Sequence, residues 1–267
     1  MMVRVLAAVV GLAVIVPAFA FGGSLAVEII VGLVVLICID EYARMAFAGP
    51  SRVVDQVALT VFCAGVYIPI VYLGDGAVLP GFLATALGIF VYTTLRPGPE
   101  LKHAADRAGR MFLGTVWIGA LMASFPLLRG LPDGLWWITL ALALPWLGDT
   151  GAYFTGRAFG KHKLYVRISP KKTWEGALGG IIAATLGVLG LGWFALPQLG
   201  TVECVVLGLV LGGLAILGDL GESMLKRAFD VKDSGWIMPG HGGLLDRVDS
   251  VLFVAPALYV YVTVTGA

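Results

Sequence analysis

Long apolar runs, separated by polar stretches, fill most of this chain. They are continuous and do not alternate at every second residue, so they predict helices and not the strands of a barrel. A helix needs about 20 apolar residues to span a bilayer core. The pattern therefore predicts an all-α integral membrane protein, a polytopic bundle of about nine transmembrane helices. The segments are residues 3–21, 24–40, 56–73, 78–95, 111–128, 134–149, 177–197, 203–221 and 250–265.

The first segment, "MMVRVLAAVVGLAVIVPAFAF", has two interpretations. A basic residue, an apolar core and the run "PAFA" are also typical of a cleaved signal peptide. The next apolar segment follows after barely one turn, as in a helical hairpin. This spacing favours a retained membrane helix.

Composition supports the membrane interpretation. The chain is 59% hydrophobic and 13% charged, with a mean hydropathy of +0.93; a soluble domain carries about 25% charged residues. Cys38, Cys63 and Cys204 lie in apolar runs without metal-ligand spacing, so they indicate neither a disulfide nor zinc. No linker divides the chain. We expect one transmembrane domain over residues 1–267, with 1–133 mainly as scaffold and 134–267 carrying the catalytic site.

The basic residues predict the orientation. Lysine and arginine concentrate in cytoplasmic loops. With nine helices, all of the 18 Lys and Arg residues except Arg129 fall on one side. This places the N-terminus in the cytoplasm and the C-terminus outside. The long polar loops share the cytoplasmic side, so the functional site is expected there.

The loop after the sixth segment, "GDTGAYFTGRAFGKHKLYVRISPKKTWEGALGG", combines glycines, a Ser-Pro turn and basic residues. Gly156 and Gly160 would let a phosphate approach the backbone, and Lys171 and Lys172 would neutralise it. Thr173 could cap the following helix, leaving free N–H groups for an anion. Positive-inside topology by itself is an alternative explanation of the lysines.

Carboxylates supply a second signal. Asp149 ends the sixth segment, where a charge near the membrane interior suggests function, although an exposed interfacial residue is the alternative. If the eighth helix continues beyond Asp219, then Glu222, Ser223 and Lys226 share one of its faces. This face leads into the most polar part of the chain.

The stretch "KRAFDVKDSGWIMPGHGGLLDRVDS" joins the last two segments. Gly242 and Gly243 precede Asp246 and Asp249 at the start of the ninth helix, where carboxylates are favoured by the helix dipole. If the eighth and ninth helices are adjacent, as an antiparallel pair should be, Asp219 lies close to Asp246, and their carboxylate oxygens could share a hard cation such as Mg²⁺. A loop tied by salt bridges is the alternative. His241 could be structural or a phosphate donor.

Basic residues, oxygen ligands and glycines at a membrane surface indicate phosphoryl or nucleotidyl transfer to a lipid headgroup. A phosphate nucleophile is already ionised at neutral pH and needs no strong base. We found no convincing Ser/His/Asp or Cys/His arrangement in the sequence, which agrees with this chemistry.

The run "SMLKRAFDVKDSGWIMPGHGGLLDRVD" resembles the signature of the CDP-diacylglycerol synthases, or phosphatidate cytidylyltransferases. Its polar positions match the family pattern, and Met238 stands where Leu, Ile or Phe is usual. The segment "DTGAYFTGRAFGKHKL…SPKKTWEG" resembles the family's second conserved region. The matching residues are Ser223, Lys226, Arg227, Lys232, Asp233, Pro239, His241, Gly242, Gly243, Asp246, Arg247 and Asp249.

The resemblance implies transfer of CMP from CTP to phosphatidate, giving CDP-diacylglycerol and pyrophosphate, in a bacterial cytoplasmic membrane with the site facing the cytoplasm. It also implies Mg²⁺, a second monovalent cation such as K⁺, and a homodimer, with membrane lipids but no nucleic acid as partners. The implied catalytic residues are Asp219, Asp246, Lys226 and Arg247. The implied substrate-binding residues are Ser223, Arg227, Lys171, Lys172, Thr173, Lys232, His241, Gly242 and Gly243. The metal ligands are predicted to be Asp219, Asp246, Asp249 and Asp149.

Three alternatives stay open at this point. A polyprenol kinase would use CTP differently, and a CDP-alcohol phosphotransferase would need a paired Asp motif that this sequence lacks. An anion transporter would carry charges at several helix midpoints, whereas nearly all charge here lies toward the cytoplasmic ends.

Overall fold

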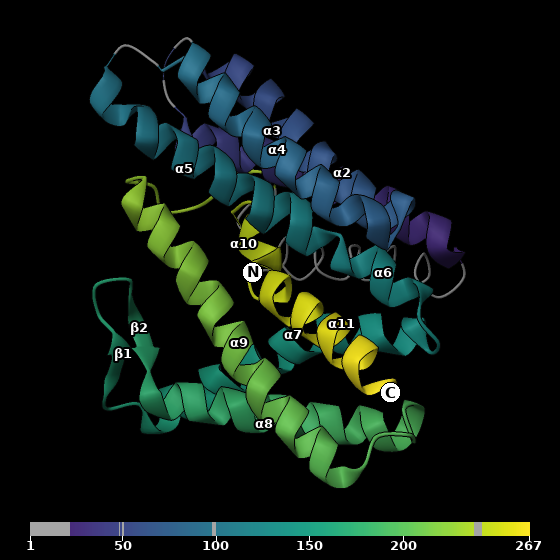
Figure 1. Ribbon diagram of the computed structural model, residues 1–267. Helices are drawn as coiled ribbons and strands as arrows, with labels where there is room; N and C mark the ends of the chain where they lie inside the picture. Colours follow the sequence, from purple (N-terminus) through teal and green to yellow (C-terminus); the bar gives the residue numbers. More distant parts are fainter. Residues whose placement is uncertain (1–21, 48, 50, 98–99, 238–241) are drawn as a thin grey trace.

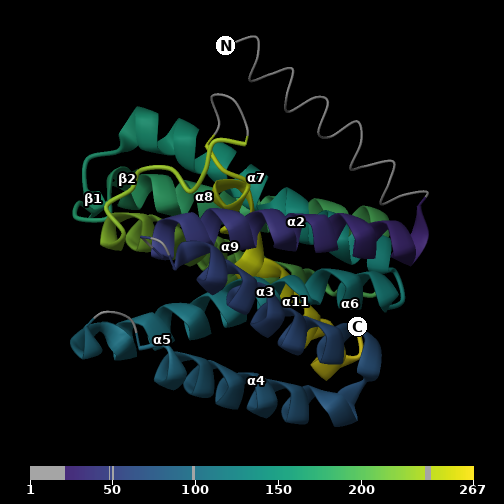
Figure 2. The same ribbon diagram turned by 90° about the horizontal axis from the view of Figure 1, so that it is seen from above.

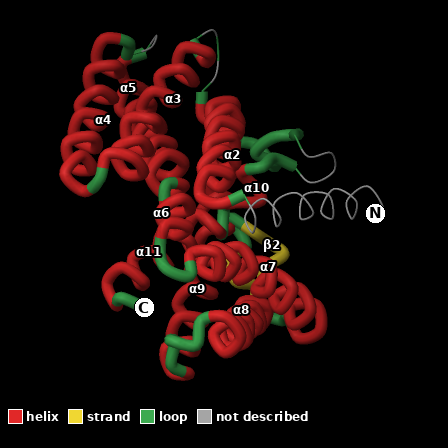
Figure 3. Tube along the Cα trace, turned by 90° about the vertical axis from the view of Figure 1, so that its right-hand side faces the viewer, coloured by secondary structure: helices red, strands yellow, loops and turns green. Residues whose placement is uncertain are grey.

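The computed structural model describes residues 22–267, apart from residues 48, 50, 98–99 and 238–241. Helices form most of the described chain, and one short hairpin accompanies them (Figure 3). The prediction of a helical protein is therefore confirmed for this part of the chain. The predicted first helix, residues 3–21, and His241 lie outside the described residues.

The N-terminal helices form one group, seen at the top of Figure 1. Fully buried Tyr42, Ile39, Leu59 and Met111 pack in its core. Its elements are α2 (Gly23–Ala46), α3 (Arg52–Ile68), the π-helical η1 (Pro69–Leu73), α4 (Asp75–Leu95), the 3₁₀ turn η2 (Leu101–His103), α5 (Ala104–Gly114), the π-helical η3 (Thr115–Ala120) and α6 (Ser124–Gly130).

The C-terminal helices form a second group, and the last helix joins it to the first. That helix contacts α6 on one side and the seventh and ninth helices on the other (Figures 1 and 2). The elements are α7 (Gly134–Phe159), β1 (Lys163–Tyr165), β2 (Ser169–Thr173), α8 (Trp174–Ala195), α9 (Thr201–Ala228), α10 (Leu245–Val248) and α11 (Val251–Thr265).

Several helices suit a bilayer by length and by surface. Leu33, Leu87 and Phe90 are more than half exposed, as side chains facing lipid would be. The apolar helix α11 has 15 residues, fewer than the about 20 that a membrane-spanning helix needs. The predicted total of nine spans stays a prediction. In the described part of the chain, six segments are long and apolar enough to cross a membrane: Gly23–Ala46, Arg52–Leu73, Asp75–Leu95, Leu101–Gly130, Trp174–Ala195 and Thr201–Ala228.

One predicted helix boundary is wrong, and one predicted helix is less regular than expected. The predicted fifth helix, residues 111–128, lies within the apolar segment Leu101–Gly130, in which α5 passes through the π-helical η3 before α6 begins. There the chain packs so closely that a Cβ on Gly119 would lie 2.9 Å from Cys63 Cα. The predicted sixth helix ends at Asp149, whereas α7 continues to Phe159 because its small residues pack against α8.

The hairpin replaces part of the predicted loop. Strands β1 and β2 pair antiparallel, with Lys163 opposite Thr173 and Tyr165 opposite Ser169. The Ser-Pro pair interpreted as a turn, Ser169 and Pro170, lies inside β2. Proline is tolerated there because a two-stranded sheet has only edge strands. The hairpin leads directly into α8 and so places the adjacent lysines at its N-terminus.

Candidate active site

A cavity of about 550 Å³ opens between α7, α8 and α9, beside β2. Apolar and small residues such as Leu144, Pro145 and Ala215 form part of its wall. Charged residues line it as well: Asp149 and Arg157 from α7, Lys171 and Lys172 from β2, and Asp219 from α9. The cavity therefore offers an apolar wall and both signs of charge in one space.

Close packing of α7 against α8 shapes this cavity. A Cβ on Gly180 would lie 2.9 Å from the Gly148 carbonyl oxygen, and one on Gly151 would lie 2.7 Å from the Gly179 carbonyl oxygen. Small residues allow such helix contacts in membranes. Gly156, expected to approach a phosphate, lies within α7 against Thr173 and Gly176. It lines the cavity, but its small size first serves helix packing.

Thr173 caps α8 as predicted. Its hydroxyl accepts a hydrogen bond of 3.1 Å from the Gly176 N–H, which satisfies one free donor in the first turn. The cap fixes the end of β2, where Lys171 and Lys172 lie. Both lysines line the cavity, so the structure brings this part of the predicted site together.

Asp219 and Lys172 form an ion pair across the cavity. The lysine Nζ lies 2.5 Å from Asp219 Oδ2, and each side chain is between a quarter and a third exposed. The Ser223 hydroxyl lies 3.4 Å from Asp219 Oδ1, one helical turn along α9. The predicted face of α9 is confirmed, because the helix continues to Ala228 and carries these residues with Glu222 and Lys226.

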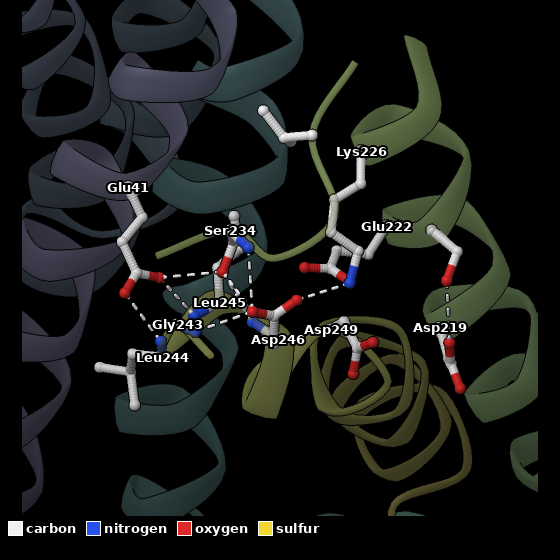
Figure 4. A network of polar contacts seen from close by, with 12 residues as sticks. Glu41, Asp219, Glu222, Lys226, Ser234, Gly243, Leu244, Leu245, Asp246 and Asp249 are labelled. Carbon is white, nitrogen blue, oxygen red and sulfur yellow. Dashed lines mark hydrogen bonds and ion pairs between the residues drawn. The ribbon is translucent and has the colours of Figure 1, made fainter. Parts of the chain in front are cut away.

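A second polar cluster surrounds Asp246 (Figure 4). Lys226 Nζ lies 2.5 Å from Asp246 Oδ1. The other oxygen, Oδ2, accepts hydrogen bonds from the Ser234 N–H (3.0 Å), the Ser234 hydroxyl (2.9 Å) and the Gly243 N–H (2.8 Å). Burial alone would raise the pKa of Asp246, but hydrogen bonds with Lys226, Glu222 and Gly243 outweigh it and lower the pKa to about 2. The carboxylate thus holds α9 and the segment before α10 together.

Glu222 completes this cluster from α9. Its side chain is 1% exposed and forms an ion pair with Lys226. Lys226 therefore lies between two carboxylates, which fix the position of its charge.

Gly242 has a positive φ of 81°, and a Cβ there would lie 2.6 Å from Asp246 Oδ2, so the turn requires glycine.

Asp249 lies between Asp219 and Asp246 in Figure 4, just before α11 begins. The side chain is buried and accepts a hydrogen bond from the Ser250 N–H at 2.5 Å. Burial raises the pKa of Asp249 to about 7, and the negative charges of Asp219 and Asp149 contribute to the rise. Carboxylates from α7, from α9 and from the turn between α10 and α11 therefore influence one another.

The remaining predicted residues are less closely involved. Arg247 is exposed. Its positive charge interacts electrostatically with Asp149, so this part of α10 lies near α7. Arg227 donates to the Val231 carbonyl oxygen at 3.2 Å, and Lys232 is exposed. Neither Arg227 nor Lys232 is among the described residues that line the cavity.

Glu41 was not among the predicted site residues, and its surroundings differ from those of its neighbour Asp40. Asp40 pairs with Arg44 at 2.8 Å, an ordinary interfacial contact. Glu41 is 3% exposed and accepts backbone hydrogen bonds from Leu244 and Leu245. A carboxylate near the end of an apolar helix was the available signal, but its partners lie about 200 residues away along the chain.

The carboxylates fit a hard divalent cation by chemistry. Mg²⁺ in such sites is commonly held by one or two carboxylates together with substrate phosphates and water. No three Asp, Glu, His or Cys side chains are already gathered closely enough to hold an ion in the part of the chain that the structure describes. Asp219 and Asp249 lie beside each other in Figure 4 and their charges interact, so they suit this smaller set.

Comparison with known proteins agrees with this chemistry. A family model described as "Cytidylyltransferase family" matches residues 2–265. A phosphatidate cytidylyltransferase of Staphylococcus epidermidis is 35% identical over 265 residues, 97% of each chain. One from Staphylococcus aureus is 34% identical over the same share. One from Bacillus subtilis is 44% identical over 178 residues, 66% of this chain and 65% of the relative.

Proposed function

We propose roles for two groups of residues: those around Asp219 and Lys172 in the cavity, and the cluster around Asp246. The chain belongs to the cytidylyltransferase family and transfers CMP from CTP to phosphatidate in the membrane. The products are CDP-diacylglycerol and pyrophosphate. One observation carries the assignment of the site: the cavity between α7, α8 and α9 combines lysines, carboxylates and an apolar wall. A polar triphosphate and a lipid phosphate could meet there while the acyl chains stay in the bilayer.

Lys171 and Lys172 bind phosphate in this proposal. They lie at the end of β2, fixed by the Thr173 cap, and both line the cavity. Lys172 is held by Asp219 and is positioned to exchange that partner for a phosphate group. Positive charge held in place before the reaction stabilises a departing pyrophosphate at little reorganisation cost.

Asp219 and Asp249, with Asp149 nearby, would hold Mg²⁺, and the ion would offset phosphate charge during transfer. Asp246, which the sequence also predicts as a ligand, already accepts hydrogen bonds from Lys226, Ser234 and Gly243. We assign it instead to holding this segment in place. No residue is named for the second, monovalent cation.

The reaction needs orientation more than acid–base chemistry. A phosphatidate oxygen attacks the α-phosphorus of CTP, the new P–O bond forms, and the bond to pyrophosphate breaks in line. The attacking oxygen is already ionised at neutral pH, so no residue has to remove its proton. Lys226, held between Glu222 and Asp246, is not among the described residues that line the cavity, and it stays a catalytic candidate.

We further propose that the site faces the cytoplasm, with the C-terminus outside, in a bacterial cytoplasmic membrane. The support is the distribution of Lys and Arg, of which Arg129 is the exception. A homodimer is the expected assembly, and a single band of dimer mass after crosslinking in membranes would support it.

A label-transfer assay tests the proposal. Purified protein with phosphatidate and Mg²⁺ should pass label from [α-³²P]CTP into the lipid fraction and release pyrophosphate. Lipid label from [γ-³²P]CTP instead would indicate a lipid kinase and contradict the assignment. Absence of lipid label from either substrate would also contradict it.

A further inference from the structure

Glu41 lies at the contact between the N-terminal helices and the segment that carries Asp246 (Figure 4). It belongs to α2, while the residues that it contacts belong to the stretch between α9 and α11. Its Oε1 accepts the Leu244 N–H at 2.9 Å, and its Oε2 accepts the Leu245 N–H at 2.8 Å. One carboxylate thus binds two successive backbone donors directly before Asp246.

The same carboxylate also contacts the other side of this segment. The Ser234 hydroxyl lies 3.3 Å from Glu41 Oε2 and 2.9 Å from Asp246 Oδ2. Since a hydroxyl has one hydrogen, the two carboxylates compete for it. Glu41, Ser234 and Asp246 therefore form one connected network in which a shift of one residue moves the next.

The backbone lies very close to the Glu41 carboxylate on both sides. A Cβ on Gly235 would lie 2.4 Å from Glu41 Oε1, and one on Gly243 would lie 2.5 Å from Oε2. Two glycines thus let the chain pass on both sides of the carboxylate. The neighbouring Tyr42 packs edge-on against Phe229, just after α9, at a ring-centroid distance of 6.2 Å. Consecutive residues of α2 therefore hold both ends of the segment from Phe229 to Leu245.

We propose that Glu41 is a positioning residue for CMP transfer: it fixes the start of α10 and thereby the placement of Asp246 and Asp249. Glu41 touches neither substrate in this proposal and acts through the Leu244 and Leu245 amides. The N-terminal half is then more than a scaffold, because α2 sets the geometry of carboxylates that lie about 200 residues later. The inference rests on the proposed role of the Asp246–Asp249 segment.

The test replaces Glu41 by glutamine, which keeps the shape but turns one acceptor into a donor facing an N–H group. We expect Glu41→Gln to lower kcat roughly 10-fold or more while KM for CTP stays within about 3-fold, since misplacement affects the transition state more than binding. Amide hydrogen exchange over residues 242–250 should rise about 10-fold in the same variant.

Asp55→Asn is the matched control. Asp55 is 2% exposed, lies in α3, pairs with Arg107 and accepts a hydrogen bond from Tyr92 at 2.7 Å, away from the cavity. This variant should lose stability but keep kcat within about 3-fold of the wild type. Equal loss of kcat in both variants would overturn the inference, because it would indicate a general effect of losing a buried carboxylate.

Glu41→Asp covers the case in which the glutamine variant does not fold. It keeps the charge but is one methylene shorter, so it cannot reach both amides in the same way, and it should also lower kcat roughly 10-fold. Wild-type kcat in a folded Glu41→Asp or Glu41→Gln protein would overturn the inference. The wild-type protein in the same assay separates this outcome from failure of CMP transfer itself.

Discussion

At the scale of single residues, the site depends on how each charge is compensated. Asp246 is surrounded by donors, and its pKa falls to about 2, whereas Asp249 is buried near other carboxylates, and its pKa rises to about 7. Two aspartates three positions apart therefore lie in different electrostatic surroundings. The sequence predicts both as metal ligands, and spacing alone does not show which donors each carboxylate meets after folding.

Lys172 should be essential for turnover. Lys172→Ala removes the cation that faces Asp219 in the cavity, so we expect kcat/KM for CTP to fall about 100-fold. Lys102→Ala is the control, since Lys102 is 71% exposed and pairs with Glu100 in another loop. Steady-state kinetics in detergent micelles would measure both. Comparable losses in the two variants would show that the phosphate site is misplaced.

Asp249 should make the cation-free protein sensitive to pH. Its pKa is raised on folding, so its contribution to stability is fully present below the unfolded pKa and is lost as the pH rises toward about 7. A shift of this size corresponds to up to about 4 kcal/mol. Thermal unfolding in EDTA should therefore show a Tm that declines from pH 4.5 to 7.5.

Two comparisons isolate this effect. Asp249→Asn should make the decline less steep, because the amide does not ionise, and Mg²⁺ should reduce the decline in the wild type by favouring the ionised carboxylate. An unchanged slope in Asp249→Asn would exclude this residue as the source.

At the scale of elements, periodicity predicted helices well and their ends poorly. The face of α9 that joins Asp219 to Lys226 followed from spacing alone, and α9 continues as expected. The extension of α7 to Phe159 did not follow, because glycines that suggest a loop can also serve close packing against another helix. Which of the two occurs depends on α8, and one segment's sequence does not contain that information.

Helix packing gives a test at this scale. Gly151→Ala places a Cβ 2.5 Å from Ala183 Cβ, so it should destabilise the protein by about 1–3 kcal/mol and lower activity by separating α7 from α8. Gly190→Ala, also in a helix but with nothing within 4 Å of the added Cβ, should be neutral or slightly stabilising. Thermal unfolding and CMP transfer would be compared for the two variants. Equal effects would argue that glycine content, and not close packing, matters.

At the scale of the whole molecule, the sequence indicated a helical membrane protein and the family. The link from α2 to the segment near α10 could not be predicted, because contacts between Glu41 and residues about 200 positions away leave no local pattern. By default, a charged residue near the end of an apolar helix is expected to lie at the membrane–water interface. Only the assembled helices distinguish buried Glu41 from Asp40, which pairs with Arg44 in an interfacial contact.

Orientation can be tested by cysteine labelling in intact cells. Gln198→Cys, between α8 and α9, should react with a membrane-impermeant maleimide from outside, whereas Lys163→Cys in β1 should react only after lysis. The native Cys38, Cys63 and Cys204 are buried, which keeps the background low. Labelling of Lys163→Cys in intact cells would reverse the proposed orientation.

We propose that Asp219, which lines the cavity, shares a divalent cation with Asp249, while Asp246 holds its segment in place. Mn²⁺ binding to the purified protein, followed by the EPR signal of free Mn²⁺, tests this most directly. Asp219→Asn and Asp249→Asn should each weaken binding about 10-fold or more, and Asp246→Asn should weaken it less than either of them. Loss of Mn²⁺ binding in Asp246→Asn with unchanged binding in the other two variants would contradict the account.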